Sequence, residues 1–408
     1  MIRCVRLLVA ALIASACFGS AALVRADSGP GSGGDVVPDE VVVKLARAED
    51  VQSVAVEYRL DPVPLARFGA QPIFRMRIID GVEPVKRAQA LVQDVRVIYA
   101  EPNYFGEAPR DRQDASWASG FGSLDLVTSQ WANEKLGLQR AQRLSRGAGV
   151  TVAVLDTGID ASHPLLADHL VSGYDFVDLD ADPAEQSGGS AFGHGTHVAG
   201  LIATVAPEAR IMPLRVLDAN GVGNIWVLAE ALQYAIDPDG NPATDDGVQV
   251  VNLSISTTHR TRLLHDLLES VSGSVRLGPV VVAAAGNAGT TTPEYPAAEN
   301  QDGLLAVGAS TRSDGLAPFS NRGSWVHVIA PGVGIASSVP GGRFAAWSGT
   351  SMSAALVSGE AALVRSKQPQ LGARTVARRI IETATRLEGG SPRIDLTAAL
   401  SASRTSSN

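Results

Sequence analysis

Continuous apolar runs separated by longer mixed segments dominate the second part of this 408-residue chain. Such runs, rich in β-branched residues, lie at 150–155, 210–216, 248–253, 280–284 and 304–307. Strands of this kind are buried on both faces, because a strand with one solvated face would alternate apolar and polar positions. The segments between them are long enough for crossover helices. The pattern therefore predicts an α/β domain over residues 131–402, with a mainly parallel sheet covered by helices on both faces.

A smaller α+β unit is expected in front of this domain, at residues 39–105. Its pattern predicts strands at 40–45, 73–79 and 95–99 and helices at 48–58 and 83–93. Residues 27–38 form a Gly/Pro/Ser linker, and residues 106–130 are polar and interrupted by Pro109 and two glycines. We expect 106–130 to be a connector between the two domains and 403–408 to be a tail.

Residues 1–26 have the layout of a secretory signal peptide. Arg3 and Arg6 precede an apolar stretch at 7–18, and small residues lead to Ala26. A membrane anchor is the weaker interpretation, because the uninterrupted apolar run is shorter than the roughly 20 residues that a spanning helix needs. No later segment is expected to span a bilayer. We therefore expect a secreted protein, in the periplasm or outside the cell.

The cysteines and the charge narrow this picture. Cys4 and Cys17 both lie in the predicted signal peptide, so the exported chain would contain neither a thiol nor a disulfide. Small residues before Cys17 loosely fit a lipoprotein cleavage site, which leaves lipid anchoring at Cys17 as an alternative. Removing the signal takes away three arginines and no acid, so the formal charge falls from −8 to −11. A strongly acidic chain argues against a nucleic-acid partner.

Four polar sites follow predicted strands or begin predicted helices, where an α/β sheet places its functional groups. Asp156 follows the strand at 150–155, and Asn287 follows the strand at 280–284. His194 lies in a Gly-His-Gly-Thr-His segment, and Ser351 precedes a helix at 354–365. Each site alone has a plainer explanation, such as a turn cap for Asp156 or a helix cap for Ser351. The histidine pair lacks a third ligand at metalloprotease spacing, which argues against zinc.

Together, and in the order Asp, His, Ser, these segments resemble the subtilisin-like (subtilase) family. The resemblance covers roughly residues 130–400 and includes the segments 319–325, 330–332 and 393–396. It implies a serine endopeptidase with Asp156, His194 and Ser351 as the catalytic triad and Asn287 as an oxyanion-hole donor. Chemistry of this kind requires no cofactor. The expected partners are polypeptide substrates, and we expect a monomer.

The resemblance extends to the small domain, because residues 39–105 look like the propeptide that subtilases carry ahead of the catalytic domain. It implies a self-inhibited precursor in which the propeptide acts as an intramolecular inhibitor. A permanently attached accessory domain is the plainer alternative. Cleavage within 106–130 would distinguish the two.

The substrate cleft departs from the family pattern. The expected substrate-binding residues are Ser254, Ile255, Ser256, Ala284, Gly286 and Glu294. Ser256 and its neighbour Thr257 replace two glycines of the family's cleft strand, so side chains are expected where a peptide should approach. Glu294 stands where relatives often carry glycine, at the floor of the primary specificity pocket. There a carboxylate would favour Lys or Arg, unless it points to solvent.

Two further departures concern the serine helix and calcium. Residues 355–359 replace the family's Pro-His-Val-Ala-Gly, which we expect to alter stability rather than chemistry. The insertion that carries a calcium site in many relatives is absent, and Leu165 stands where their calcium-binding aspartate would be. A different acidic loop offers oxygen ligands for a structural calcium ion, although a solvated acidic turn explains it equally well. Its candidate ligands are Asp237, Asp239, Asn241 and Asp245.

Two other functions remain open at this point. A catalytically silent domain that binds peptides is suggested by the substituted cleft strand, but the complete triad argues against it. An ester or amide hydrolase acting on small substrates is the other alternative. The propeptide-like domain argues mildly against that class.

Overall fold

A computed structural model of the chain describes residues 34–109, 111–117, 122–241, 244, 246–273, 277–387 and 390–402. The predicted signal peptide, most of the linker, Asp245 and the predicted tail lie outside these ranges. The predicted cleavage site after Ala26 and the lipid-anchor alternative at Cys17 lie outside them as well.

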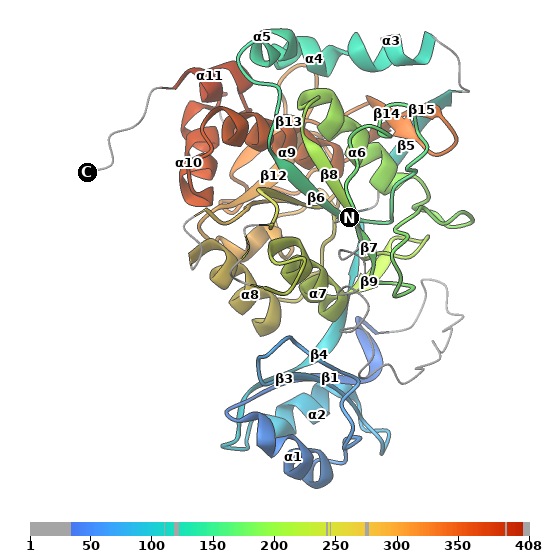
Figure 1. Ribbon diagram of the computed structural model, residues 1–408, viewed down its shortest axis with the longest axis vertical. Coiled ribbons are helices and arrows are strands. Elements are labelled where there is room, and N and C mark those ends of the chain that lie inside the picture. Colours follow the sequence, from blue (N-terminus) through green and yellow to red (C-terminus); the bar gives the residue numbers. More distant parts are fainter. Residues whose placement is uncertain are drawn as a thin grey trace, which may run out of the picture. The chain divides into compact units, whose positions relative to one another are not determined.

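A seven-stranded sheet forms the centre of the larger domain (Figure 1). Its order is β13-β12-β11-β10-β6-β8-β7, and every neighbouring pair is parallel. The predicted α/β fold with a mainly parallel sheet is therefore confirmed. The strands are β6 (Thr151–Asp156), β7 (Tyr174–Asp175), β8 (Arg210–Arg215), β10 (Val250–Leu253), β11 (Val280–Ala284), β12 (Leu304–Ser310) and β13 (Val328–Pro331).

Alternate residues of each strand enter two different cores, which explains the continuous apolar runs. Val152 and Val154 pack in the core that contains α6 (His194–Val205), α9 (Thr350–Lys367), α10 (Ala373–Thr383) and α11 (Leu396–Ser401). Ala153 and Leu155 pack on the other face, with α7 (Ile225–Ile236) and α8 (Arg262–Gly273). Because successive side chains of a strand point to opposite faces, a sheet covered twice needs apolar residues at every position.

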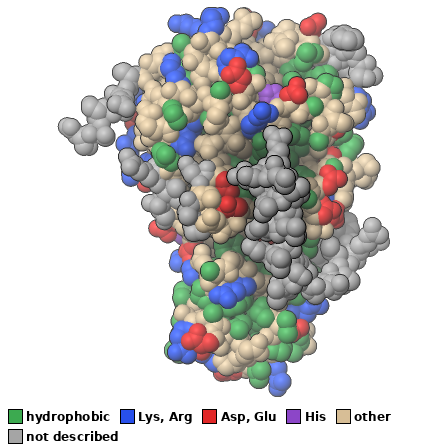
Figure 2. Space-filling model, in the orientation of Figure 1, with side chains coloured by type: hydrophobic (Ala, Val, Ile, Leu, Met, Phe, Trp, Pro, Cys, Tyr) green, Lys and Arg blue, Asp and Glu red, His purple; other side chains and the backbone are tan. Residues whose placement is uncertain are grey.

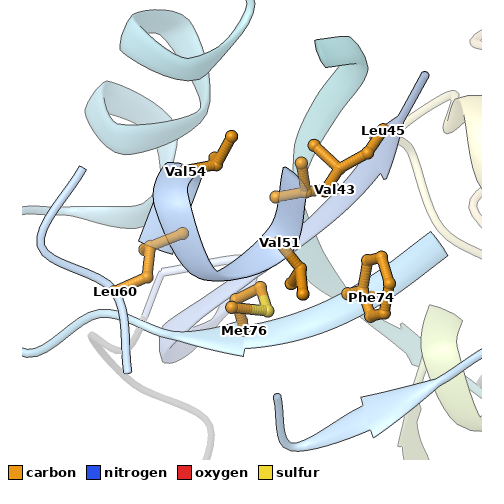
Figure 3. Close-up of a pocket in the computed structure, with 7 residues that line it drawn as sticks. All are labelled: Val43, Leu45, Val51, Val54, Leu60, Phe74 and Met76. Atoms are coloured by element: carbon orange, nitrogen blue, oxygen red, sulfur yellow. The ribbon is translucent and has the colours of Figure 1, made fainter. Parts of the chain in front are cut away.

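The small domain has the predicted α+β composition. Its strands β1 (Val36–Leu45), β2 (Ala66–Arg67), β3 (Ile73–Arg77) and β4 (Val97–Glu107) form an antiparallel sheet with η1 (Ala48–Asp50), α1 (Val51–Glu57) and α2 (Pro84–Leu91) as its helices. Its core encloses a cavity of about 10 Å³ (Figure 3). The lining is entirely apolar: Val43, Leu45, Val51, Val54, Leu60, Phe74 and Met76. A cavity without polar partners does not hold water, so the small domain has its own dry core.

The connector differs from the expected polar loop. Strand β4 continues to Glu107 and pairs with β9 (Val222–Asn224) of the larger domain. After Asp111, β5 (Arg112–Trp117) pairs with β15 (Arg343–Ser348), whose other neighbour is β14 (Ile335–Val339). The helices α3 (Gly122–Thr128), α4 (Trp131–Lys135) and α5 (Leu138–Gln142) follow. These strands depend on edges supplied by distant residues, so local polarity could not reveal them.

Lys and Arg side chains are interspersed with Asp and Glu on the face drawn in Figure 2. Within the described ranges, every helix is too short or too polar to cross a membrane.

Candidate active site

The four predicted catalytic groups stand at or near the ends of four elements of the larger domain. Asp156 is the last residue of β6, and His194 is the first residue of α6. Asn287 follows β11 by three residues, and Ser351 is the second residue of α9. The carboxyl ends of parallel strands and the amino ends of the helices that follow them lie at the same edge of a sheet. The topology therefore gathers residues that are far apart in the sequence.

Asp156 and His194 form a buried, hydrogen-bonded pair. His194 Nδ1 donates to Asp156 Oδ1 at 2.6 Å, and the Thr157 N–H donates to the same oxygen at 2.8 Å. Burial by itself lowers the pKa of His194, but the Asp156 carboxylate and a second carboxylate, that of Asp111, raise it well above its ordinary value. The bond to Asp156 uses Nδ1 and fixes the orientation of the imidazole ring, so Nε2 is the nitrogen that can face a reacting group.

Asp111 of the connector occupies the place where that group would stand. His194 Nε2 donates to Asp111 Oδ2 at 2.9 Å, and Asn287 Nδ2 donates to Asp111 Oδ1 at 2.6 Å. Both imidazole nitrogens thus face carboxylates, an arrangement that requires the doubly protonated cation. Sequence reasoning missed Asp111, because nothing in the connector's composition distinguishes it from other polar residues there.

Ser351 is buried at the start of α9. Its Oγ has no hydrogen-bond partner within the described part of the chain. The hydrogen bond that a triad of the predicted kind needs between Ser351 and His194 is therefore not formed, and His194 Nε2 bonds to Asp111 instead.

Asn287 is oriented as an oxyanion-hole donor requires. Its Oδ1 accepts from the Thr350 N–H at 2.9 Å and from Thr350 Oγ1 at 2.9 Å. Because the amide oxygen is occupied by two donors, the NH₂ group must point the other way, where Asp111 accepts from it. Thr350 was not predicted from the sequence, although it precedes the serine directly.

The connector lies along the expected substrate-binding strand. Glu107 and Ser256 exchange two backbone hydrogen bonds, of 2.9 and 2.8 Å, and the Ala108 N–H donates to Gly221 O at 2.8 Å. The side chain of Ile255 faces Gly106, where an added Cβ would lie 3.0 Å from Ile255 Cδ1. The cleft strand without its glycines therefore still pairs with an extended chain. Ser254 and Ala284 are fully buried beside this strand.

Glu294 points inward rather than to solvent. Its Oε1 accepts from Asn321 Nδ2 at 2.7 Å, and an added Cβ on Gly286 would lie 2.3 Å from Glu294 Oε2. The carboxylate is thus close to the backbone of the residue that precedes Asn287.

His197 has a different environment from His194. Its Nε2 lies 3.2 Å from the backbone oxygen of Ala345, and its ring stacks on Trp347 at a centroid distance of 4.8 Å. Burial lowers the pKa of His197 to about 3, so it is a neutral packing residue.

The residues that replace the family's Pro-His-Val-Ala-Gly after Ser351 are compatible with an unbroken α9, in which Ala355 and Leu356 are buried.

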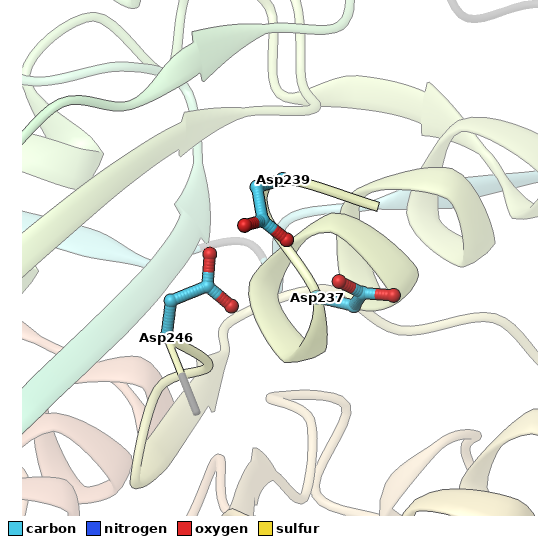
Figure 4. A group of neighbouring side chains, drawn as sticks. All are labelled: Asp237, Asp239 and Asp246. Carbon is cyan, nitrogen blue, oxygen red and sulfur yellow. The ribbon is translucent and has the colours of Figure 1, made fainter. Parts of the chain in front are cut away.

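The acidic loop brings three carboxylates together (Figure 4). Oxygens of Asp237, Asp239 and Asp246 lie within 4.8 Å of one another. The candidate set changes accordingly: Asp246 joins it, Asp245 lies outside the described residues, and Asn241 is exposed with its N–H bonded to Asp239.

Known proteins resemble this chain along most of its length. The sequence profile described as "Subtilase family" matches residues 147–397. A thermophilic serine proteinase of Bacillus sp. (strain AK1) is 38% identical over 305 residues, which are 72% of this chain and 69% of the relative. Thermitase of Thermoactinomyces vulgaris is 38% identical over 248 residues, covering 58% of this chain and 82% of thermitase.

A solved structure supports the same fold. Fervidolysin from Fervidobacterium pennivorans, described as a keratinolytic enzyme related to subtilisin, superposes with a TM-score of 0.75 at 24% identity. The match covers 92% of this chain and 62% of the fervidolysin chain. The profile match, the two relatives and the shared fold agree with the geometry above, and the chain belongs to the subtilase family of subtilisin-like serine peptidases.

Proposed function

We propose that the chain is the secreted precursor of a serine endopeptidase, with Asp156, His194 and Ser351 as its triad. The observation that carries the proposal is the 2.6 Å bond from His194 Nδ1 to Asp156 Oδ1, together with a buried Ser351 hydroxyl that has no partner in the described chain. In the freed enzyme, His194 Nε2 would take the proton of Ser351 as the oxygen attacks a peptide carbonyl. It would then return the proton to the leaving amine. Asp156 would hold the tautomer and stabilise the imidazolium.

Asn287 Nδ2 and the Ser351 N–H would donate to the oxyanion of the tetrahedral intermediate. The amide orientation enforced by Thr350 supports this role for Asn287. In subtilisin, a relative of this chain, loss of one such donor lowers kcat by about 10²–10³, a measured magnitude that we adopt for Asn287. No step of this chemistry requires a cofactor.

The self-inhibited precursor is supported by contacts on both sides of the cleft. Residues 105–108 pair with β9 and with Ser256, and Asp111 binds the base and the oxyanion donor. The small domain adds contacts farther away. Glu101 accepts from the N–H groups of Arg262 and Leu263 at the start of α8, at 2.7 and 3.0 Å. A carboxylate at a helix amino end is favourable, so these contacts would hold the inhibitor in place until the connector is cut.

The position of Glu294 supports a preference for Lys or Arg before the cut. A carboxylate near Gly286 would pair with a cationic side chain. An apolar side chain would instead bury the charge with Asn321 as its one partner among the described residues. Export, a monomeric state and a calcium ion at the acidic loop belong to the same proposal.

The decisive experiment compares the wild-type chain with Ser351→Ala. Wild type should digest casein, react with a fluorophosphonate probe and shorten during refolding, whereas Ser351→Ala should do none of these. Equal labelling of both proteins would refute the nucleophile. Peptide binding without labelling of wild type would favour a silent binding domain, and cleavage of small esters without casein digestion would favour the other hydrolase class.

A further inference from the structure

Glu185 lies in the loop between β7 and α6, and four donors converge on its carboxyl group. Oε2 accepts from the Gly193 N–H at 3.0 Å and from Thr157 Oγ1 at 3.1 Å. Oε1 accepts from the Thr196 N–H at 3.0 Å and from Thr196 Oγ1 at 3.1 Å. All four of these neighbours donate to the carboxyl group. They therefore favour its ionised form, which accepts hydrogen bonds and cannot donate one.

These bonds provide hydrogen-bond acceptors for backbone N–H groups at the start of α6, the helix that begins with His194. The residue before α6, Gly193, has φ 92° and no side chain with which to cap the helix. The first amides of a helix have no partner inside it, and here Glu185 accepts from Gly193 and Thr196 while Thr157 Oγ1 accepts from the Gly195 N–H at 3.0 Å. A negative charge at this end also opposes the positive end of the helix dipole. Glu185 therefore supplies from a distant loop the cap that α6 lacks.

The same carboxylate is linked to the other member of the pair. Thr157, which donates to Glu185, also gives its N–H to Asp156 Oδ1, the oxygen that accepts from His194. The fit between the two elements is tight, because a Cβ on Gly195 would lie 2.1 Å from Gly158 O and 3.1 Å from Asp156 Oδ1. One side chain thus ties the end of β6 to the start of α6.

We infer that Glu185 is a positioning residue of the proposed triad, holding His194 against Asp156. The inference rests on the proposed function. It extends that function, because it assigns part of the base's geometry to a residue that never touches the substrate. A misplacement of about 1 Å at a reacting group can cost about 10²-fold in rate, so the cap affects turnover rather than binding.

The charged groups around this site come from several elements. Asp156 belongs to β6, His194 and His197 belong to α6, and the Asp160 N–H donates to Thr196 Oγ1 of this helix. Asp111 of the connector also faces His194. Burial raises the pKa of Glu185 to about 7, the N–H groups of Thr196 and Gly193 favour the ionised form, and the Asp156 charge adds to the rise. Above that pH the carboxylate is charged and accepts from all four donors.

The test uses the full-length chain after self-processing, with active sites counted by a fluorophosphonate. For Glu185→Gln we expect kcat to fall by about tenfold or more with KM changed by less than about twofold. The matched control is Glu208→Gln, which removes the same charge from an exposed ion pair with Arg146 and should change neither quantity.

An unchanged kcat in Glu185→Gln would overturn the inference, and so would a loss of melting temperature without a fall in kcat. If Glu185→Gln does not fold, Thr157→Val removes the hydroxyl link and leaves Glu185 its three other donors. A fall in kcat in that variant supports the inference, and wild-type kcat refutes it. A wild-type chain that never labels at Ser351 would refute the proposed function instead.

Discussion

Glu360 is a fully buried carboxyl group in the middle of α9, the helix that begins beside Ser351. Neither of its oxygens has a hydrogen-bond partner among the residues that the structure describes. Burial raises the pKa of Glu360 well above its ordinary value, and the negative charge of Asp395 adds to the rise. The folded protein therefore holds a proton on Glu360 that the unfolded chain releases near pH 4.3.

The sign of the pH dependence follows from this raised pKa. The contribution of Glu360 to stability is fully present below the unfolded pKa and is lost as the pH rises toward the folded pKa. Within that window the free energy of unfolding falls by roughly 1 kcal/mol for each pH unit, because the folded chain binds one proton more than the unfolded chain. The buried oxygens without hydrogen-bond partners also lower the free energy of unfolding by about 1–3 kcal/mol, and this cost does not depend on pH.

We therefore expect two graded effects in a Ser351→Ala background, which prevents self-digestion. Near pH 4.5 the melting temperature of Glu360→Gln should equal that of its parent. As the pH rises, the variant should melt at an increasingly higher temperature than the parent, by about 2–4 °C for each kcal/mol of stability that the parent loses. Glu360→Met, which removes the polar atoms as well, should be more stable at every pH. Thermal unfolding followed by circular dichroism from pH 4.5 to 8 measures both. Glu208→Gln is the control, because Glu208 is exposed and paired with Arg146. A difference between Glu360→Gln and its parent that does not change with pH would refute the reasoning.

Three further predictions concern the cleft and the acidic loop. Asp111→Asn places an NH₂ group against His194 or Asn287, both donors, so the precursor should label with a fluorophosphonate several-fold faster; an unchanged rate would contradict the inhibitory contact. Matched peptides with Arg or Leu before the cut should favour Arg, and Glu294→Gly should remove about tenfold or more of that preference, unless the carboxylate does not line the pocket. A chelator should lower the melting temperature if the acidic loop binds calcium, and a shift that persists in Asp239→Ala would place the ion elsewhere.

Much of the larger domain follows from local sequence. The strands β6, β8, β10, β11 and β12 were expected from their apolar runs, because burial on both faces requires apolar residues at successive positions. The strands β13, β14 and β15 were not expected. Residues 343–348 form a hairpin with the nearby β14 on one edge and pair with the distant β5 on the other, and pairing with distant chain leaves no periodic signal of its own.

The sequence by itself determined the order of Asp156, His194 and Ser351 and the kind of element that each follows or begins. It could not determine the state of the site. That state depends on Asp111 and Glu185, which lie in loops without a distinguishing pattern and reach the site only when the chain is folded. Side chains in loops are placed by the elements that flank them rather than by their neighbours in sequence. The catalytic groups were therefore proposed from the sequence, whereas only the tertiary structure showed that Asp111 contacts His194 and that Glu185 caps the helix that begins with His194.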